Sequence, residues 1–287
     1  MLPIRSYLIC ATPRSGSTLL CEALENTGIA GYPKEYFDAL KATGLPRRPK
    51  EYFPKLENPE VMKLLEDRVL LDDAPDTPAV QVASTYVDYL NQVLHKATTA
   101  NGVFGAKVMW GYFVDFISYL EDIPAFKNLS TPDLLSTIFP HLHYIWVIRC
   151  DRVRQAVSLW KAIQTQVWRE DVCKSFMNEQ VTHQHELQKK DLHFHFGAID
   201  FLIQQIEEHQ QAWQRYFNEA AIRPCIVFYE DLAANYEGTA LQILSYLNIP
   251  IPENLVFAER RMRRQADALS EEWVERYQML KQEEAVL

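Results

Sequence analysis

The feature that most constrains the fold is the stretch YLICATPRSGSTLL, residues 7–20, near the start of the chain. Its first five residues form an apolar run that is too short for a buried helix and suits a fully buried parallel strand. Small and turn-forming residues follow at 12–18, after which leucine and alanine recur at helical spacing until Gly28. The sequence therefore predicts a strand, a loop and a helix in immediate succession.

A loop that opens onto a helix N-terminus suits an anion, because several backbone N–H groups lack helical partners there and the helix dipole favours negative charge. Gly16 would let a ligand approach the backbone closely, and Arg14 could place a planar cation against it. Hydroxyls from Ser15, Ser17 and Thr18 could donate further hydrogen bonds. The alternative is an ordinary turn in which a serine or threonine caps the helix.

The loop is not a Walker A sequence. That motif requires a first glycine separated by four residues from the G-K-[ST] end, and both this glycine and the lysine are absent. A metal-assisted kinase or ATPase is therefore the less favoured interpretation of the loop.

Composition limits the class of protein. The chain has 287 residues, 48% of them hydrophobic, which is enough for one sizeable α/β core, so we expect a single domain over 1–287. The formal net charge of −9 argues against a nucleic-acid partner, so an anionic ligand must be held by a local group of cations. There is no signal-like apolar segment, no stretch long enough for a membrane span and no zinc-type cysteine spacing, and we expect a soluble, cytoplasmic protein.

Further strands are predicted at 103–110, 141–148 and 225–229, the first of them containing Lys107 and the second ending just before Arg149. In open parallel sheets, ligands bind at the carboxyl ends of the strands. Helical spacing is found at 60–71, 84–97, 131–139, where Thr131 would be the cap, from 191 to 208, and between 230 and 248.

The segment 29–59 contains five prolines, which forbid a long helix, and interleaved aromatic residues. Such a segment could line an acceptor pocket, because sugar rings stack on aromatic side chains. Anchoring of the loop to the core is the alternative for each aromatic residue. Glu35 lies within this segment.

The loop T-P-R-S-G-S-T-L-L resembles the phosphosulfate-binding loop of sulfotransferases, and more narrowly the bacterial trehalose sulfotransferase family. Four further stretches resemble that family in the same order along the chain, namely 31–37, 101–110, 149–169 and 264–277.

The resemblance implies a P-loop-like α/β fold with a mainly parallel sheet and helices on both faces. It implies 3′-phosphoadenosine 5′-phosphosulfate (PAPS) as donor, 3′-phosphoadenosine 5′-phosphate (PAP) as product, no metal, and a carbohydrate acceptor such as a trehalose-like sugar or glycolipid. A homodimer is compatible with it. Glu35 would be the general base and Arg14 a second catalytic residue. The implied PAPS-binding residues are Pro13, Arg14, Ser15, Gly16, Ser17, Thr18, Arg149, Ser158, Arg264 and Gln265, and the acceptor-binding residues are Tyr32, Pro33, Glu35, Tyr36, Phe37 and Tyr52.

Two other functions remain open on the sequence alone. A P-loop nucleotide or sugar kinase would use ATP and magnesium, and a non-catalytic nucleotide-binding protein would bind without transfer. Binding of PAP, PAPS, ATP and AMP distinguishes the nucleotides, and sulfate transfer distinguishes an enzyme from a binding protein.

Overall fold

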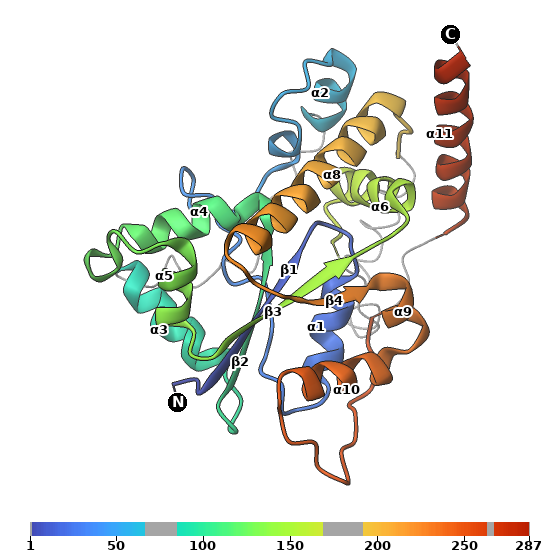
Figure 1. Ribbon diagram of the computed structural model, residues 1–287. Coiled ribbons are helices and arrows are strands. Elements are labelled where there is room, and N and C mark those ends of the chain that lie inside the picture. Colours follow the sequence, from blue (N-terminus) through green and yellow to red (C-terminus); the bar gives the residue numbers. More distant parts are fainter. Residues whose placement is uncertain (1, 67–84, 169–191, 263–266, 287) are drawn as a thin grey trace, which may run out of the picture. The chain divides into compact units, whose positions relative to one another are not determined.

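The structure is a computed structural model that describes residues 2–66, 85–168, 192–262 and 267–286 (Figure 1). The chain divides into two compact units: unit 1 is Met1–Pro46, Ala74–Cys150 and His209–Arg260, and unit 2 is Arg47–Asp73, Asp151–Glu208 and Arg261–Leu287. The elements are β1 (Arg5–Ala11), α1 (Ser17–Glu25), η1 (Pro49–Tyr52), α2 (Pro59–Glu66), α3 (Tyr86–Lys96), β2 (Val103–Met109), α4 (Trp110–Glu121), η3 (Pro124–Phe126), α5 (Thr131–Ile138), β3 (Leu142–Ile148), α6 (Arg152–Thr165), α8 (Phe196–Glu219), β4 (Cys225–Phe228), α9 (Tyr229–Ala234), α10 (Tyr236–Tyr246) and α11 (Ala268–Val286).

Unit 1 is built on a parallel sheet with the strand order β2-β1-β3-β4. The apolar run near the N-terminus is β1, and it lies between β2 and β3 with Ile9 opposite Lys107 on one side and Ile145 on the other. Parallel strands that are buried on both faces read as continuous apolar runs, and all seven residues of β2 are buried. Because the strands are parallel, their carboxyl ends meet at one edge of the sheet.

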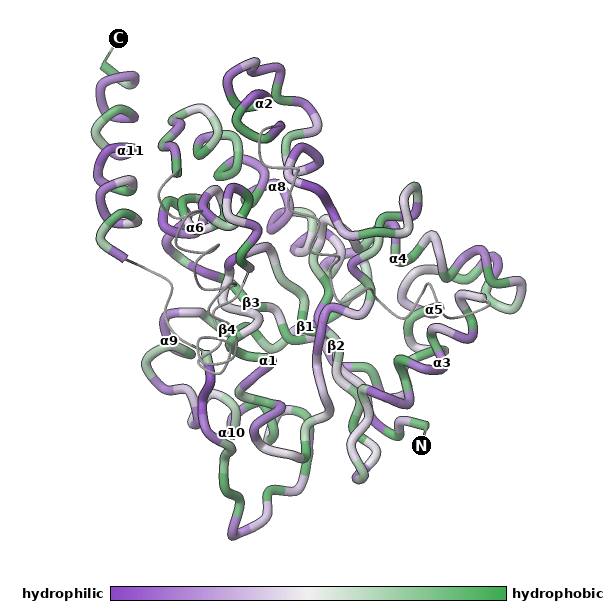
Figure 2. Tube along the Cα trace, turned by 180° about the vertical axis from the view of Figure 1, so that it is seen from behind, coloured by the Kyte–Doolittle hydropathy of each residue, from purple (hydrophilic) through white to green (hydrophobic). Residues whose placement is uncertain are grey.

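One face of the sheet packs on α3, α4, α5 and the C-terminal half of α8. Figures 1 and 2 both show α3, α4 and α5 grouped on one side of the strands. Leu8 and Cys10 of β1 contribute to this core together with Trp213 and Phe217 of α8. The indole Nε1 of Trp213 donates to the carbonyl of Ala11 at 3.0 Å, which ties α8 to the last residue of β1.

The opposite face carries α1, with α10 packed beside it. Side chains alternate along a strand, so Tyr7, Ile9, Gly105 and Lys107 share this face. Tyr7 occupies the space above Gly105, where a Cβ would overlap its ring, and its hydroxyl donates to the carbonyl of Ala30 at 2.6 Å. Unit 1 is thus a mixed α/β unit whose sheet has helices on both faces, which confirms the predicted fold class.

Unit 2 contains α2, α6, the first half of α8 and α11 around its own apolar core. Trp160 of α6 is fully buried and packs edge-on against Phe53. On the side of α6 that faces α11, Arg154 forms an ion pair of 2.6 Å with Glu271, and Lys161 forms one of 2.6 Å with Asp267. These pairs join the two helices within the unit.

The predicted strands agree with the observed ones to within one residue at each end, except that β1 begins at Arg5, two residues earlier than predicted. Three helix predictions need correction. Ser130, not Thr131, caps α5, because its hydroxyl accepts from the Asp133 N–H. The long helix begins at Phe196, not at residue 191, and continues to Glu219. The helix expected at 230–248 is interrupted at Asn235, whose non-helical backbone, with φ −137° and ψ 72°, separates α9 from α10. Among the described helices, none combines the length and apolar character needed to cross a bilayer.

Candidate active site

The loop after β1 opens onto a helix end that no side chain caps. The N-cap residue of α1 is Gly16, with φ 89° and ψ 5°, and the structure shows no side-chain hydrogen bond to this end of the helix. The serine or threonine cap considered from the sequence is therefore not formed. The first N–H groups of α1 stay available to an anion, and the helix dipole favours negative charge there.

The loop backbone is shaped for close approach of a ligand. Arg14 and Gly16 both have positive φ, 62° and 89°, with Ser15 between them. Alternation of this kind turns successive N–H groups towards one point and forms an anion-binding concavity. The Ser15 hydroxyl is fully buried and has no hydrogen-bond partner among the described residues. A buried hydroxyl of this kind is a natural donor to a bound oxyanion.

Arg149 and Tyr229 complete the loop site from the ends of β3 and β4. A Cβ at residue 16 would overlap the ring of Tyr229, so this position requires glycine for space as well as for backbone conformation. The Arg149 guanidinium lies 4.8 Å from the centre of the same ring, and its Nη1 donates to the Arg14 carbonyl at 3.4 Å. Three strand ends thus place a cation, an aromatic ring and the loop together.

Tyr229 is a site residue that the sequence analysis did not select. It is the last residue of the apolar run CIVFY, and the signal that could have identified it is its place directly after the carboxyl end of a strand of the parallel sheet. Its stacking contact holds the guanidinium of Arg149 beside the loop.

Glu35 lies close to the loop through a buried lysine. The Nζ of Lys107 is 2.6 Å from Oε1 of Glu35 and donates to Oγ1 of Thr18 at 2.9 Å. The Lys107 side chain is 7% exposed and that of Glu35 is 32% exposed, so the carboxylate is the open end of the pair. Its second oxygen, Oε2, forms no hydrogen bond or ion pair with any part of the chain that the structure describes.

The segment that carries Glu35 runs along the edge of the sheet. The N–H of Lys107 donates to the carbonyl of Lys34 at 2.9 Å, which holds the segment against β2. Gly31, with φ 77°, makes this approach feasible, because a Cβ there would lie 2.8 Å from the backbone nitrogen of Gly105. Local backbone contacts therefore position Glu35 beside the anion loop.

Charges in this cluster perturb one another. Burial disfavours the charged form of Lys107, yet its pKa lies above the ordinary value, because the Glu35 carboxylate, Cys21 and Asp38 together outweigh that penalty. Burial, followed by repulsion from Glu35, raises the pKa of Asp38 to about 7. The cluster therefore holds a buried cation, and the carboxyl of Asp38 ionises less readily than an ordinary aspartate.

Asp38 should make the stability depend on pH. Its pKa rises from 3.8 to about 7 on folding, so the folded state binds more protons than the unfolded state between these values. The free energy of unfolding contributed by this group falls as the pH rises through that window. Asp38→Asn should therefore stabilise the protein by about 1–2 kcal/mol at pH 8 and by little near pH 4. The full pKa shift sets an upper limit of about 4 kcal/mol for this effect. Urea unfolding at both pH values, with exposed Asp231→Asn as control, measures this; an equal effect at both pH values would contradict it.

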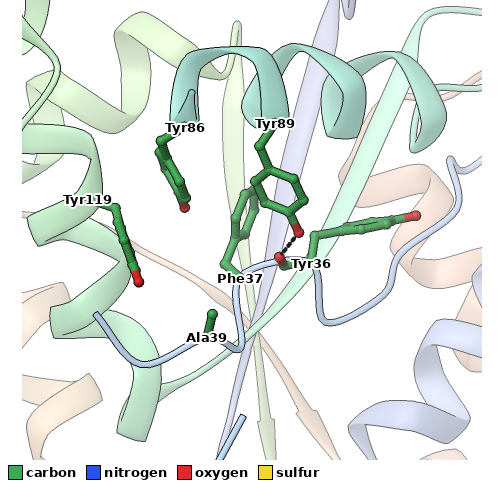
Figure 3. A pocket seen from close by; sticks show the side chains of 6 residues that line it. All are labelled: Tyr36, Phe37, Ala39, Tyr86, Tyr89 and Tyr119. Carbon is green, nitrogen blue, oxygen red and sulfur yellow. Dashed lines mark hydrogen bonds between the residues drawn. The ribbon is translucent and has the colours of Figure 1, made fainter. Parts of the chain in front are cut away.

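Several aromatic residues near Glu35 and on α3 and α4 pack together. Figure 3 shows Tyr36, Phe37, Tyr86, Tyr89 and Tyr119 around a small pocket, with the Tyr89 hydroxyl donating to the backbone carbonyl of Tyr36. The space among them is about 10 Å³, which holds about one water molecule and no sugar. The aromatic side chains around this pocket anchor the segment, and the pocket itself is too small to be an acceptor site.

Two residues expected to bind the acceptor are buried in the cores. Phe37 is 4% exposed and stacks on Phe116 with ring centres 4.1 Å apart. Tyr52, in unit 2, is 7% exposed and stacks on Trp168 at 5.4 Å. For both, the burial favours the alternative of a loop anchor. Tyr32, by contrast, is 39% exposed.

The structure does not place the other predicted PAPS-binding residues beside the loop. Ser158 is on α6 in unit 2, whereas the loop after β1 belongs to unit 1. Arg264 and Gln265 lie outside the described residues. Within the described ranges, no group of three or more histidine, cysteine, aspartate or glutamate side chains is arranged to hold a metal ion.

A parallel sheet flanked by helices, with an uncapped helix end after its first strand, defines this unit as a mixed α/β unit with a candidate anion site. Comparison with known proteins specifies the family. The sequence model of the Stf0 sulphotransferase family matches residues 6–279, so the chain belongs to that family. Its resemblance to bacterial trehalose sulfotransferases is confirmed.

Two curated relatives have the same name. Trehalose 2-sulfotransferase of Mycolicibacterium smegmatis is 32% identical over 286 residues, covering 95% of this chain and 94% of the relative. Trehalose 2-sulfotransferase of Mycobacterium tuberculosis is 31% identical over 282 residues, covering 96% and 94%. Both similarities extend over nearly the whole length of each protein.

Proposed function

We propose that this chain transfers a sulfuryl group from PAPS to a hydroxyl of a trehalose-like sugar, with Glu35 as the general base. The observation that carries the proposal is the chain of contacts from the uncapped loop through Thr18 and Lys107 to Glu35, since it sets a carboxylate beside an anion site. The family supports transfer of sulfate, and the names of both relatives support a sugar such as trehalose.

The loop residues fit the anionic part of PAPS. The open end of α1, the buried Ser15 hydroxyl and the space kept free by Gly16 would bind oxygens of the 5′-phosphosulfate. Arg149 would bind the 3′-phosphate together with Ser158, as the family resemblance implies. Arg264 and Gln265 would contribute from the C-terminal segment. When bound, PAPS supplies an electrophilic sulfur and a phosphate leaving group.

Glu35 would act on the acceptor. Its free oxygen Oε2 would accept the proton of the attacking sugar hydroxyl as the new oxygen–sulfur bond forms and the bond from sulfur to the leaving phosphate breaks. Lys107 would keep the other oxygen in place. The exposed ring of Tyr32, three residues before Glu35 and followed by Pro33, offers an apolar face against which a sugar can stack.

Nucleotide binding should depend on the 3′-phosphate. The parent protein should bind PAP more tightly than AMP by about 1.5–3 kcal/mol, or about one to two decades of affinity, because AMP lacks a charge-assisted contact with Arg149. Arg149→Ala should remove most of this preference. Isothermal titration calorimetry with PAP, AMP and ATP measures it, alongside a radiolabelled-sulfate transfer assay with trehalose.

Arg223→Ala is the matched control for that experiment, because Arg223 is exposed and precedes β4, at the opposite edge of the sheet from the site. Equal affinities of the parent for PAP and AMP would refute the 3′-phosphate assignment. Preference for ATP together with the absence of sulfate transfer would favour a kinase instead.

A further inference from the structure

Lys107 is an unusual residue for the interior of a sheet. It lies in the fully buried strand β2 and is 6% exposed, so its ammonium does not reach solvent. Removing an ammonium from water carries a large free-energy penalty, and an apolar residue of similar volume is often as stable or more stable at such a position. Its retention in the core therefore calls for a role other than stability.

The contacts of Lys107 join the two sides of the site. One ammonium hydrogen is directed at Oε1 of Glu35, 2.6 Å away, and another at Oγ1 of Thr18, 2.9 Å away. Thr18 is in the first turn of α1, immediately after the anion loop, whereas Glu35 is on the segment that we assign to the acceptor. A single side chain thus fixes the distance between the carboxylate and the loop.

We propose that Lys107 is a positioning residue for the reaction, holding the Glu35 carboxylate in a fixed orientation and at a fixed distance from the anion loop. This inference rests on the proposed function, in which Glu35 is the base. Lys107 occupies Oε1, so the proton of the acceptor is directed to Oε2. Its positive charge also favours the ionised carboxylate, which is the form that a base requires.

The other groups that face Lys107 set the pH dependence of this arrangement. They are Asp38, from the same segment as Glu35, and Cys21, from α1, while Thr18 contributes only a neutral hydroxyl. Repulsion between Glu35 and Asp38 opposes their simultaneous ionisation, and Lys107 is the cation that reduces it. Without Lys107, protonation of the base should occur at higher pH.

Lys107→Met tests the proposal because it keeps the length of the side chain and removes the charge. We expect kcat to fall about tenfold to hundredfold, the size typical of losing the partner that orients a functional side chain. The acidic limb of the kcat/KM profile should move upward by about one pH unit or more. PAP affinity, measured by calorimetry, should change less than about fivefold.

Two further variants make the test independent of folding and of indirect effects. Lys107→Gln retains a donor to Glu35 but no charge, so it should show the same upward pH shift with a smaller loss of kcat, even if Lys107→Met fails to fold. In a Glu35→Gln background, Lys107→Met should reduce turnover less than about twofold further, because a positioning residue acts through its partner.

The matched control is Lys34→Met, which removes a lysine whose side chain is 52% exposed. Two results would overturn this inference and leave the proposed function intact. One is an unchanged acidic limb of the kcat/KM profile in both Lys107 variants, and the other is an undiminished effect of Lys107→Met in the Glu35→Gln background. A parent protein that transfers no sulfate from PAPS would overturn the proposed function and this inference with it.

Discussion

Glu35→Gln should bind PAP as the parent does and lose about 10²- to 10⁴-fold in kcat, the range typical for removal of a general base. A sugar hydroxyl is a weak nucleophile at neutral pH, so its attack on sulfur is assisted by a base that accepts the proton as the bond forms. Glutamine keeps the size of the side chain and its contact with Lys107, 2.6 Å away in the parent, but it cannot accept the proton as a base.

Steady-state kinetics at saturating acceptor separate this role from simple binding of the sugar. If Glu35 only hydrogen-bonds the acceptor, Glu35→Gln should raise KM and leave kcat nearly unchanged. A kcat within about threefold of the parent would refute the base role. Glu25→Gln is a suitable control, because Glu25 ends α1 and pairs at 3.9 Å with the exposed Lys34.

Arg14→Ala should lower kcat by about 10²- to 10³-fold while weakening PAP binding much less. Arg14 is in the loop itself, with φ 62°. Its backbone carbonyl accepts a hydrogen bond from the Arg149 side chain, and this contact survives the substitution because it does not involve the Arg14 side chain. The side chain is proposed to act on the transferring sulfuryl group, where charge is redistributed in the transition state, and PAP lacks that group. Loss of one such stabilising donor typically reduces kcat by about this factor.

Arg14→Lys provides the comparison that isolates charge from shape. A lysine retains the charge but not the planar pair of donors, so it should recover part of the lost turnover. Both variants should be compared by kcat at saturating PAPS and acceptor and by calorimetry with PAP. Parental turnover in Arg14→Ala would show that Arg14 has only a structural role in the loop.

The sequence by itself determined the local elements of unit 1. The apolar runs ending at Ala11, Met109 and Ile148 are strands, because burial on both faces requires an apolar residue at nearly every position, and the run ending at Phe228 is the partly exposed strand β4. The loop could also be recognised as a candidate anion site, since glycine and small hydroxyl residues between a strand and a helix are a local pattern.

Tertiary structure decided which of the local alternatives is realised. The sequence of the loop is compatible both with a serine or threonine cap and with an open helix end. The structure shows the open end, because Gly16, beside the ring of Tyr229, takes the N-cap position. As aromatic residues, Phe37 and Tyr52 suited either an acceptor pocket or a loop anchor, and packing against Phe116 and Trp168 buries them. Such packing depends on residues distant in the chain, and periodicity carries no information about them.

The same reason explains why Lys107 could not be assigned from sequence. A lysine near the end of a predicted strand can extend to solvent or face a ligand, and its own neighbours do not distinguish these outcomes. The register that places Lys107 opposite Ile9 directs its side chain to the face covered by α1, where Thr18 and Glu35 bind its ammonium. Strand order and register are set by the whole sheet, so only the folded chain shows that a base, a cation and an anion loop form one site.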